Sequence, residues 1–287
     1  MFTCTGRISM HEPNLQNVPR TFAIPCEYLT MHTGTTDHVA EFNCRNIFKA
    51  ARGYVIVSAD YCQLEMRILT HFSKDQVLMK IMKSDMDVFK SIAASWSNVP
   101  EEQVDDDLRQ KAKQLCYGII YGMGNKTLGQ LLDVTEMEAA VFMDTFYKTY
   151  PAVKEFTQSV KEECRDKGYV ETLMKRRRYL DDIRSSSVSI KSAAERQAVN
   201  TTIQGSAADI AKAAMCSIDT MTDAIDPKPR LILQMHDELI YEVPEAYQHY
   251  FITIIKEVME NTIELTVPLP VKVKTGPTWG SLKEIEF

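Results

Sequence analysis

The sequence predicts an α+β protein, in which an antiparallel sheet is interrupted by a long helical segment. Two apolar runs of strand length, Val55–Asp60 and Leu231–Gln234, lie far apart in the chain. Between them, residues 68–204 carry mainly the periodicity of amphipathic helices. The alternating segment Val271–Lys274 then returns to a strand pattern. This order of strands, helices and strands predicts the α+β class.

The strands are predicted where apolar or alternating residues are followed by turn or polar residues. They are Val55–Asp60, Leu231–Gln234, Leu239–Val243 and Val271–Lys274, the last followed by Gly276 and Pro277. Residues 26–41 are polar and rich in threonine, which is typical of a surface loop.

The helices are predicted where apolar residues recur on one helical face. They are Leu78–Lys83, Val88–Trp96, Asp106–Tyr121, Thr135–Tyr150, Val153–Lys167 and residues 247–263. Thr135 is followed three residues later by Glu138, the pattern of a capping box at a helix start.

Composition sets limits on the class of protein. The chain has 287 residues, 45% of them hydrophobic, enough to bury a substantial core. Its formal charge of −6 is unusual for a protein that binds nucleic acid, because phosphate contacts normally require a basic surface. A local basic block does occur from Lys175 to Arg178, although such a run is as often a soluble surface as a binding site.

The cysteines and the apolar segments indicate the compartment. Seven cysteines show no CxxC pair and no metal-ligand spacing, and their odd number argues against a disulfide framework. No apolar stretch approaches the roughly 18 residues needed to span a bilayer, and residues 1–20 do not have the pattern of a signal peptide. We therefore expect a soluble, intracellular protein with reduced thiols and no membrane partner.

Two of the predicted strands end in acids, Asp60 and Asp237. An Asp just past a strand is most often a turn residue. Two such carboxylates at neighbouring strand ends can instead hold Mg²⁺, which prefers carboxylate oxygens and leaves positions open for substrate phosphates.

A stripe of cations and phenols lies between these acids. Arg109, Lys113, Tyr117 and Tyr121 recur every four residues, which places them along one helical face. A solvated basic face beside ordinary core aromatics is the alternative. That alternative explains poorly the glycines that follow the tyrosines, Gly118 and Gly122, which we expect to interrupt the helix. Cations suit a polyphosphate, and tyrosines beside glycines suit a flat sugar and base.

Six ordered motifs, covering nearly the whole chain outside residues 26–41, resemble those of the family A DNA polymerases. They are TGR (5–7) with PNLQNVP (13–19), DYCQLEMR (60–67), RQKAKQLCYGIIYGMG (109–124), RRRY (176–179), AERQ (194–197) through QGSAAD (204–209), and QMHDE (234–238). Within the family, DDLRQKAKQLCYGIIYGMG and SIAASW are most similar to the theta type, with the nu type next.

The resemblance implies a right-hand polymerase fold. Its palm would comprise residues 1–67, with a loop insertion near 26–41, and residues 205–287; its fingers would comprise 68–204. The family carries a thumb upstream of the TGR motif, so we expect the thumb to be missing here, with a thumb and a helicase-like region upstream in the parent protein. A second insertion of theta-like enzymes, ahead of QMHDE, is replaced by residues 226–229.

The resemblance also implies site roles, a cofactor of two Mg²⁺ ions, and deoxynucleoside triphosphates and primer–template DNA as partners. The catalytic residues would be Asp60, Asp237, Lys113 and Glu238, and the metal ligands Asp60, Asp237 and the Tyr61 carbonyl. The nucleotide would contact Arg109, Lys113, Tyr117, Glu65, Gln63 and Tyr121. The DNA would contact Arg7, Gln16, Asn17, Arg176, Arg177, Arg178, Arg196, Asn200, Gln204 and His236.

The implied activity is DNA synthesis, in DNA repair and in the nucleus. Glu65 would exclude a 2′ hydroxyl and hydrogen-bond Tyr117, while Tyr121 would stack at the templating-base position. Lys175 and Asp181 depart from the Gly and Pro of the family around the arginine block, which puts the local turn in doubt. A histidine that contacts the triphosphate in many relatives is absent at Phe89.

Two other functions compete. A single-subunit RNA polymerase shares the plan of Asp, Arg, Lys, Tyr and Asp, but Glu65 would block its ribonucleotide substrate. A non-catalytic DNA-binding fragment is the second alternative, because the thumb is expected to be absent.

Overall fold

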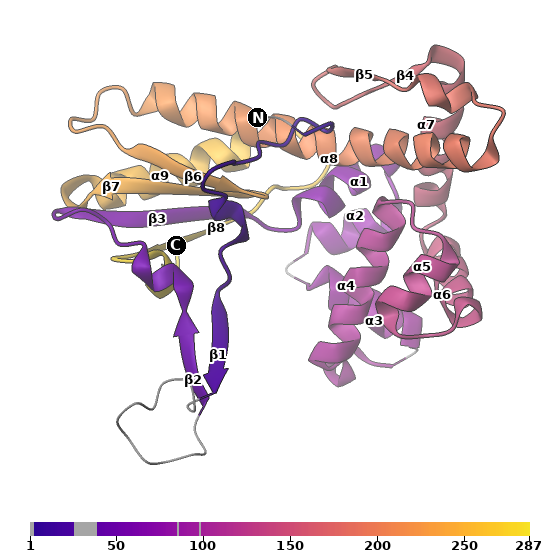
Figure 1. Cartoon of the computed structure of the whole chain (residues 1–287), viewed down its shortest axis with the longest axis horizontal. Coiled ribbons are helices and arrows are strands. Elements are labelled where there is room, and N and C mark those ends of the chain that lie inside the picture. The colour runs from indigo at the N-terminus through magenta and orange to yellow at the C-terminus, as the bar shows by residue number, and fades with distance from the viewer. Residues whose placement is uncertain (1–2, 26–38, 85, 98) are drawn as a thin grey trace.

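The computed structural model describes residues 3–25, 39–84, 86–97 and 99–287. It confirms the α+β class: an antiparallel sheet forms one half of the molecule and a group of helices the other, and the helix α8 runs along both (Figure 1).

The main sheet has five strands in the order β6-β7-β3-β8-β9, all paired antiparallel. Their bounds are Tyr54–Tyr61 for β3, Arg230–Met235 for β6, Glu238–Pro244 for β7, Val271–Gly276 for β8 and Lys283–Glu284 for β9. The strands expected from the sequence are confirmed, and β9 is an addition. The central strand β3 is buried on both faces, which is why its sequence is an almost continuous apolar run.

The helices are confirmed where a strong apolar face predicted them, and several were not expected. Their bounds are Leu64–Ser73 (α1), Gln76–Met82 (α2), Val88–Ser97 (α3), Asp106–Ile120 (α4), Asn125–Leu132 (α5), Glu136–Thr149 (α6), Pro151–Lys167 (α7), Val188–Met221 (α8) and Gln248–Asn261 (α9). The capping box at Thr135 is present in both directions at the start of α6. The helices α1, α5 and α8 lie outside the helix ranges expected from the sequence.

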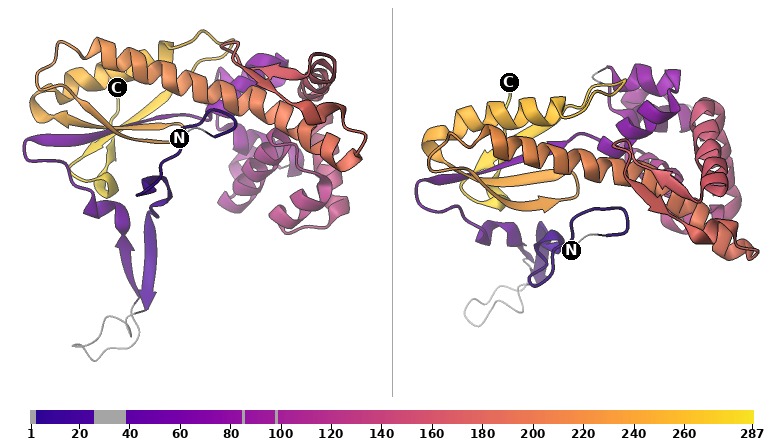
Figure 2. Two further views of the ribbon diagram at one scale, coloured as in Figure 1. Left: turned by 45° about the horizontal axis from the view of Figure 1, so that its top comes forward. Right: turned by 90° about the horizontal axis from the view of Figure 1, so that it is seen from above.

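The 34-residue helix α8 connects the two halves, and Figure 2 shows it passing from the sheet to the helical group. It continues unbroken past Gln204, and α1 likewise continues past Arg67. The segment boundaries expected at these two residues therefore lie inside continuous helices.

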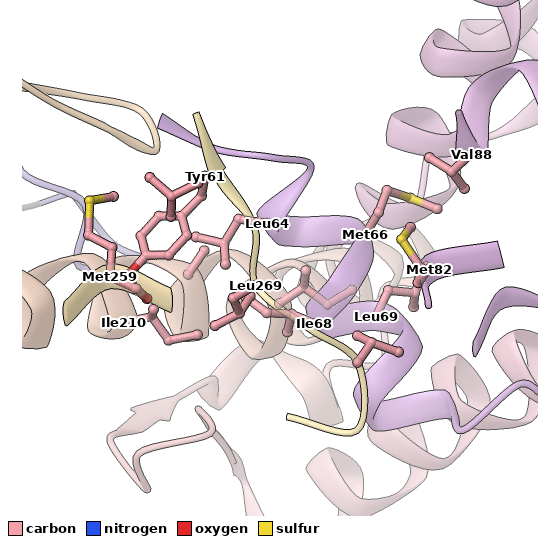
Figure 3. Packing of buried hydrophobic residues seen from close by; sticks show 14 of the residues in the cluster. Tyr61, Leu64, Met66, Ile68, Leu69, Met82, Val88, Ile210, Met259 and Leu269 are labelled. Atoms are coloured by element: carbon pink, nitrogen blue, oxygen red, sulfur yellow. Dashed lines mark hydrogen bonds between the residues drawn. The ribbon is translucent and has the colours of Figure 1, made fainter. Parts of the chain in front are cut away.

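The largest core cluster joins the sheet to the helices. Leu64, Ile68 and Leu69 of α1 are at most 1% exposed and lie in the same cluster as Ile210 of α8 and Met259 of α9 (Figure 3). A smaller cluster covers the other face of the sheet, where Ile56, Ile240 and Trp279 pack together. Because α1 follows β3 directly, this packing fixes the end of β3 relative to the helical half.

Two short ribbons complete the fold. The strands β1 (Thr21–Pro25) and β2 (Val39–Asn43) pair and project away from the sheet, and β4 (Tyr169–Glu171) pairs with β5 (Arg177–Tyr179). Of the loop expected over residues 26–41, residues 39–41 belong instead to β2, and the rest lies outside the described residues.

Six cysteines of the described part are free, and Cys26 lies outside it. Among the described residues, no helix combines the length and the apolar character that crossing a membrane requires.

Candidate active site

The two acids predicted as metal ligands lie at the same end of the neighbouring strands β3 and β7 of the main sheet. Asp60, near the end of β3, lies opposite Glu238, the first residue of β7. The Tyr61 N–H donates a hydrogen bond to the main-chain oxygen of Asp237 at 3.3 Å. Antiparallel pairing therefore brings together carboxylates that are far apart in the sequence.

The turn that carries Asp237 is tight and well anchored. Between β6 and β7 lie only His236 and Asp237, and His236 takes a left-handed conformation with φ +54°. The Gln234 amide donates to the main-chain oxygen of His236. The Gln16 amide donates to the main-chain oxygen of Gln234 at 2.8 Å, so the N-terminal segment supports this turn.

The environment disfavours the charged form of both carboxyls. Loss of hydration, followed by the nearby charge of Glu238, raises the pKa of Asp60 to about 6, and Lys113 is among the cations that oppose this shift. Burial raises the pKa of Asp237 to about 7; Arg7 opposes this shift, while Glu65 and Asp60 add to it. A divalent cation bound by the two acids would favour their charged forms and lower both pKa values.

The donor set fits Mg²⁺ rather than a metal held wholly by side chains. Among the described residues, no group of three or more His, Cys, Asp or Glu side chains is arranged to hold a metal ion. Asp60, Asp237 and the Tyr61 carbonyl offer only hard oxygen ligands, and Mg²⁺ commonly takes few protein ligands and completes its shell with water and phosphate. The Tyr61 side chain is not available, since its hydroxyl donates to the Met259 carbonyl at 2.9 Å.

Glu238 is held in place by the neighbouring strand. The Ser58 hydroxyl of β3 donates to its carboxylate. This contact favours a role in fixing the strand end and its charge over a role as a mobile acid or base.

The predicted stripe of cations and phenols lies on α4 and faces these acids. The helix starts at Asp106, with Asp105 as its N-cap accepting from the Leu108 N–H at 2.8 Å. Lys113 affects the pKa of Asp60, and the charges of Glu65 and Asp237 contribute, after burial, to a raised pKa of Tyr117. The Tyr121 hydroxyl, at the end of this face, donates to the Glu65 carboxylate at 3.0 Å, so the face looks toward the acids.

Of the two glycines expected to interrupt this helix, Gly118 does not, whereas the helix ends just before Gly122. Gly118 lies inside α4 and does not interrupt it; a Cβ there would come within 2.8 Å of the Leu128 side chain of α5. Gly122 follows the helix with φ +64°, and a Cβ there would come within 2.9 Å of the Arg196 side chain. At both glycines, neighbouring protein side chains occupy the space that a Cβ would need.

Glu65 is almost fully buried, with 2% of its side chain exposed, and both its oxygens are bound. Arg7 donates to one oxygen, and the Tyr121 hydroxyl donates to the other at 3.0 Å. The expected partner was Tyr117, so the sequence assigned this hydrogen bond to the wrong tyrosine. The two tyrosine rings stack with centroids 6.1 Å apart, which keeps Tyr117 beside the same carboxylate.

Arg109 is oriented by a residue that the sequence analysis did not single out. Asp87 accepts from two nitrogens of Arg109, both at 2.8 Å, through one carboxylate oxygen. Its other oxygen accepts from the N–H groups of Phe89 and Lys90 at the start of α3. Asp87 lies just before a predicted helix, which indicates a capping role. Its bond to Arg109 is long-range, and no local pattern indicates it.

Gln63 is the remaining residue predicted to contact the nucleotide, and three of the predicted DNA contacts lie on α8. Gln63 is the residue before α1, with φ +51°. Gln204 accepts from the Thr5 hydroxyl at 2.7 Å, and the carbonyl oxygen of the Asn200 side chain is buried without a protein partner. Arg196, also on α8, is exposed.

The predicted N-terminal DNA contacts separate into different environments. Arg7 points into the acid cluster rather than toward solvent. Gln16 uses its amide to bind the Ile8 and Gln234 carbonyls and its oxygen to accept from the Met10 N–H. Asn17 and His236 are exposed.

The three arginines of the block, Arg176 to Arg178, bind different partners. Arg176 bonds the buried Asp209 at 2.9 Å and the main-chain oxygen of Thr5 at 2.7 Å, which favours a structural role. Arg177 pairs with Glu171 on the exposed β4–β5 ribbon. Arg178 donates to Thr201 and Gln197 of α8.

The turn in doubt at Lys175 does form. Lys175 takes a left-handed conformation with φ +64°, a geometry that favours glycine, and its N–H donates to the Thr172 carbonyl at 2.9 Å. The Thr172 N–H donates to the Arg176 carbonyl at 3.0 Å and closes the turn.

Comparison with known proteins gives a consistent family. The model described as DNA polymerase family A matches residues 1–281. The chain is 43% identical to "DNA polymerase theta" of Drosophila melanogaster, over 99% of this chain and 14% of that protein. It is 38% identical to "DNA polymerase I" of Bacillus caldotenax, over 98% of this chain and 30% of that protein. The chain thus spans less than a third of the length of these curated relatives.

The fold agrees with these similarities. A solved structure, the "POL domain of Pol1 from M. smegmatis complex with DNA primer-template and dNTP", superposes with a TM-score of 0.86 and 36% identity over 97% of this chain and 47% of that chain. The right-hand polymerase fold expected from the motifs is confirmed for the region matched. The chain belongs to the family A DNA polymerases.

Proposed function

We propose that this chain catalyses template-directed DNA synthesis, adding a nucleotide from a deoxynucleoside triphosphate to the 3′ hydroxyl of a primer. Family membership supports this reaction, as does the solved relative whose name includes a DNA primer-template and a dNTP. In this proposal the main sheet is the palm, and the helices α1–α7 with the first part of α8 are the fingers.

One observation carries the proposal. Asp60 and Asp237 meet at adjoining strand ends, and the α4 face with Lys113 looks toward them. An acid pair opposite a basic helical face can hold metal ions on one side of a triphosphate and cations on the other. Burial, with the charges of neighbouring acids, raises the pKa of both carboxyls, so this pair does not stabilise the metal-free fold at neutral pH.

The residues divide the reaction between them. Asp60, Asp237 and the Tyr61 carbonyl would hold two Mg²⁺ ions, which supply charge neutralisation for the attacking hydroxyl and the triphosphate. Arg109, oriented by Asp87, and Lys113 would bind the triphosphate. Lys113 would also donate a proton to the leaving pyrophosphate.

A second group of side chains would select the sugar and the base of the nucleotide. Glu65, held by Arg7 and Tyr121, fills the space that a 2′ hydroxyl would need. Tyr117 would lie beside the 3′ position of the sugar. Tyr121 would leave Glu65 when it moves aside for an incoming template base.

The duplex would lie along α8 and the N-terminal segment. Asn200 has a buried side-chain oxygen without a protein partner, an acceptor that supports a contact with a donor on a base edge, such as the guanine amino group, when DNA is bound. Arg196 and His236 are exposed and suit phosphate contacts. We extend the proposal to a DNA repair enzyme of the nucleus, which similarity to DNA polymerase theta supports.

A primer-extension assay tests this function. The chain is mixed with Mg²⁺, low salt and a labelled primer on templates that differ only in the templating base, and one dNTP is supplied at a time. Low salt is chosen because phosphate contacts weaken as salt rises. Extension by the complementary dNTP alone is expected. Tight DNA binding with no extension would favour the non-catalytic alternative, and extension that ignores the templating base would contradict the proposal.

A further inference from the structure

Arg7 lies beside two acids of the site, Glu65 and Asp237. A guanidinium nitrogen of Arg7 contacts the Glu65 carboxylate and lies 3.9 Å from an oxygen of Asp237. Its charge is also the largest influence that opposes the raised pKa of Asp237. Arg7 therefore acts as a counter-ion to the Asp237 carboxylate, which in the proposed function binds a metal ion.

The segment that delivers Arg7 is pinned from several sides. The Thr5 hydroxyl donates to Gln204 at 2.7 Å, and Arg176 donates to the Thr5 carbonyl at 2.7 Å. Gly6 takes φ +90°, and a Cβ there would lie 2.8 Å from the Arg176 guanidinium. This close packing directs the next side chain, Arg7, inward to the carboxylates rather than outward to solvent.

We propose that Arg7 is a built-in competitor of divalent metal ions at Asp237 in the DNA-free protein. A guanidinium and a metal ion cannot both neutralise the same carboxylate oxygen at full strength, because each repels the other. Metal ions bind more weakly while Arg7 faces Asp237 and more tightly once its charge has left. The inference deepens the proposed function, because it rests on Asp237 as a metal ligand.

The size of the effect follows from the distance. A unit charge about 4 Å from the ligand oxygen changes the affinity for a cation by about five- to tenfold at water-like effective dielectric constants, and by more where the site is less hydrated. Removing the guanidinium also frees the charge of Glu65, which acts in the same direction.

The test measures Mn²⁺ binding by the DNA-free chain from the electron paramagnetic resonance signal of the hydrated ion. Arg7→Gln and Arg7→Met both remove the charge, so the result does not depend on the folding of a single variant. Each is expected to bind Mn²⁺ about tenfold more tightly than the unmodified chain, with threefold as the lower limit. Arg7→Lys keeps a cation and should bind nearly as weakly as the unmodified chain.

The controls separate charge at this site from net charge. Lys148→Gln removes a cation from the exposed surface of α6, where Lys148 pairs with Asp144, and should leave Mn²⁺ binding unchanged. Melting curves in EDTA establish that each variant is folded.

The outcomes distinguish this inference from the proposed function. If neutral substitution of Arg7 leaves Mn²⁺ binding unchanged or weakens it, while Asp237→Asn abolishes binding, the competition is refuted and the metal site stands. If Asp237→Asn and Asp60→Asn bind Mn²⁺ as the unmodified chain does, the metal assignment fails, and this inference fails with it.

Discussion

Replacing Asp237 by Asn should stabilise the metal-free protein while removing a residue of the proposed reaction. The pKa of Asp237 rises from an ordinary 3.8 to about 7, because the carboxyl is buried beside Glu65 and Asp60. At pH values between these two pKa values, the folded state therefore keeps a proton that the unfolded state has lost. Stability consequently falls as pH rises through this window, and the full cost is present above about pH 7.

The magnitude can be worked from the shift. Roughly three pKa units correspond to at most about 4 kcal/mol. The side chain is 21% exposed, and solvent reduces the effect, so we expect about 1–2 kcal/mol. For a chain of this size that gain raises Tm by roughly 2–6 °C. Asn is neutral at every pH, so the gain should be full at pH 8 and less than half as large at pH 5.

Thermal melting in EDTA at pH 5 and pH 8, followed by circular dichroism, measures this difference. Asp144→Asn, on the exposed surface of α6, is the matched control and should change Tm little at either pH. A destabilised Asp237→Asn at pH 8, or a gain equally large at both pH values, would refute the reasoning about burial and charge.

Two further predictions concern the sugar site and the arginine block. Glu65→Ala should raise ribonucleotide use relative to deoxynucleotide use. Tyr117→Phe should lower dideoxynucleotide use, with normal synthesis largely retained. Unchanged sugar selectivity of both variants in single-turnover assays would show that these residues do not flank the sugar. Arg176→Ala should cost about 1–3 kcal/mol in unfolding free energy because it removes one of the two cations that contact the buried carboxylate of Asp209 and leaves only Lys212, whereas Arg177→Ala, which breaks an exposed pair, should cost less than about 1 kcal/mol. Urea unfolding of both variants measures the contrast, and equal losses would contradict the structural role of Arg176.

Local patterns predicted much of the fold. The strand β3 was found because a strand buried on both faces needs an apolar run, and α6 because its start carries a complete capping box. The helix α5 was missed: its N-cap is Gly124, which offers no side-chain cap to mark the start. The start of α1 was hidden in the same way, because Gln63 precedes it in a left-handed conformation.

The side chains of the site could be identified by motif, but their partners could not. Glu65 bonds Arg7, 58 residues away, and Tyr121, 56 residues away. Such pairs depend on how β3, α1 and α4 pack, and no local pattern encodes that. The same limit explains why Arg176 resembled a DNA contact in sequence and is held by Asp209 in the structure.

The central claim is that Asp60 and Asp237 together hold the metal ions for nucleotidyl transfer, and single-turnover incorporation of one nucleotide in Mg²⁺ tests it most directly. Asp60→Asn and Asp237→Asn should each lower the rate at least about a thousandfold, equivalent to about 4 kcal/mol of transition-state stabilisation, with primer–template binding changed much less. Asp144→Asn should incorporate at the unmodified rate. Near-normal incorporation by either site variant would contradict the two-carboxylate account.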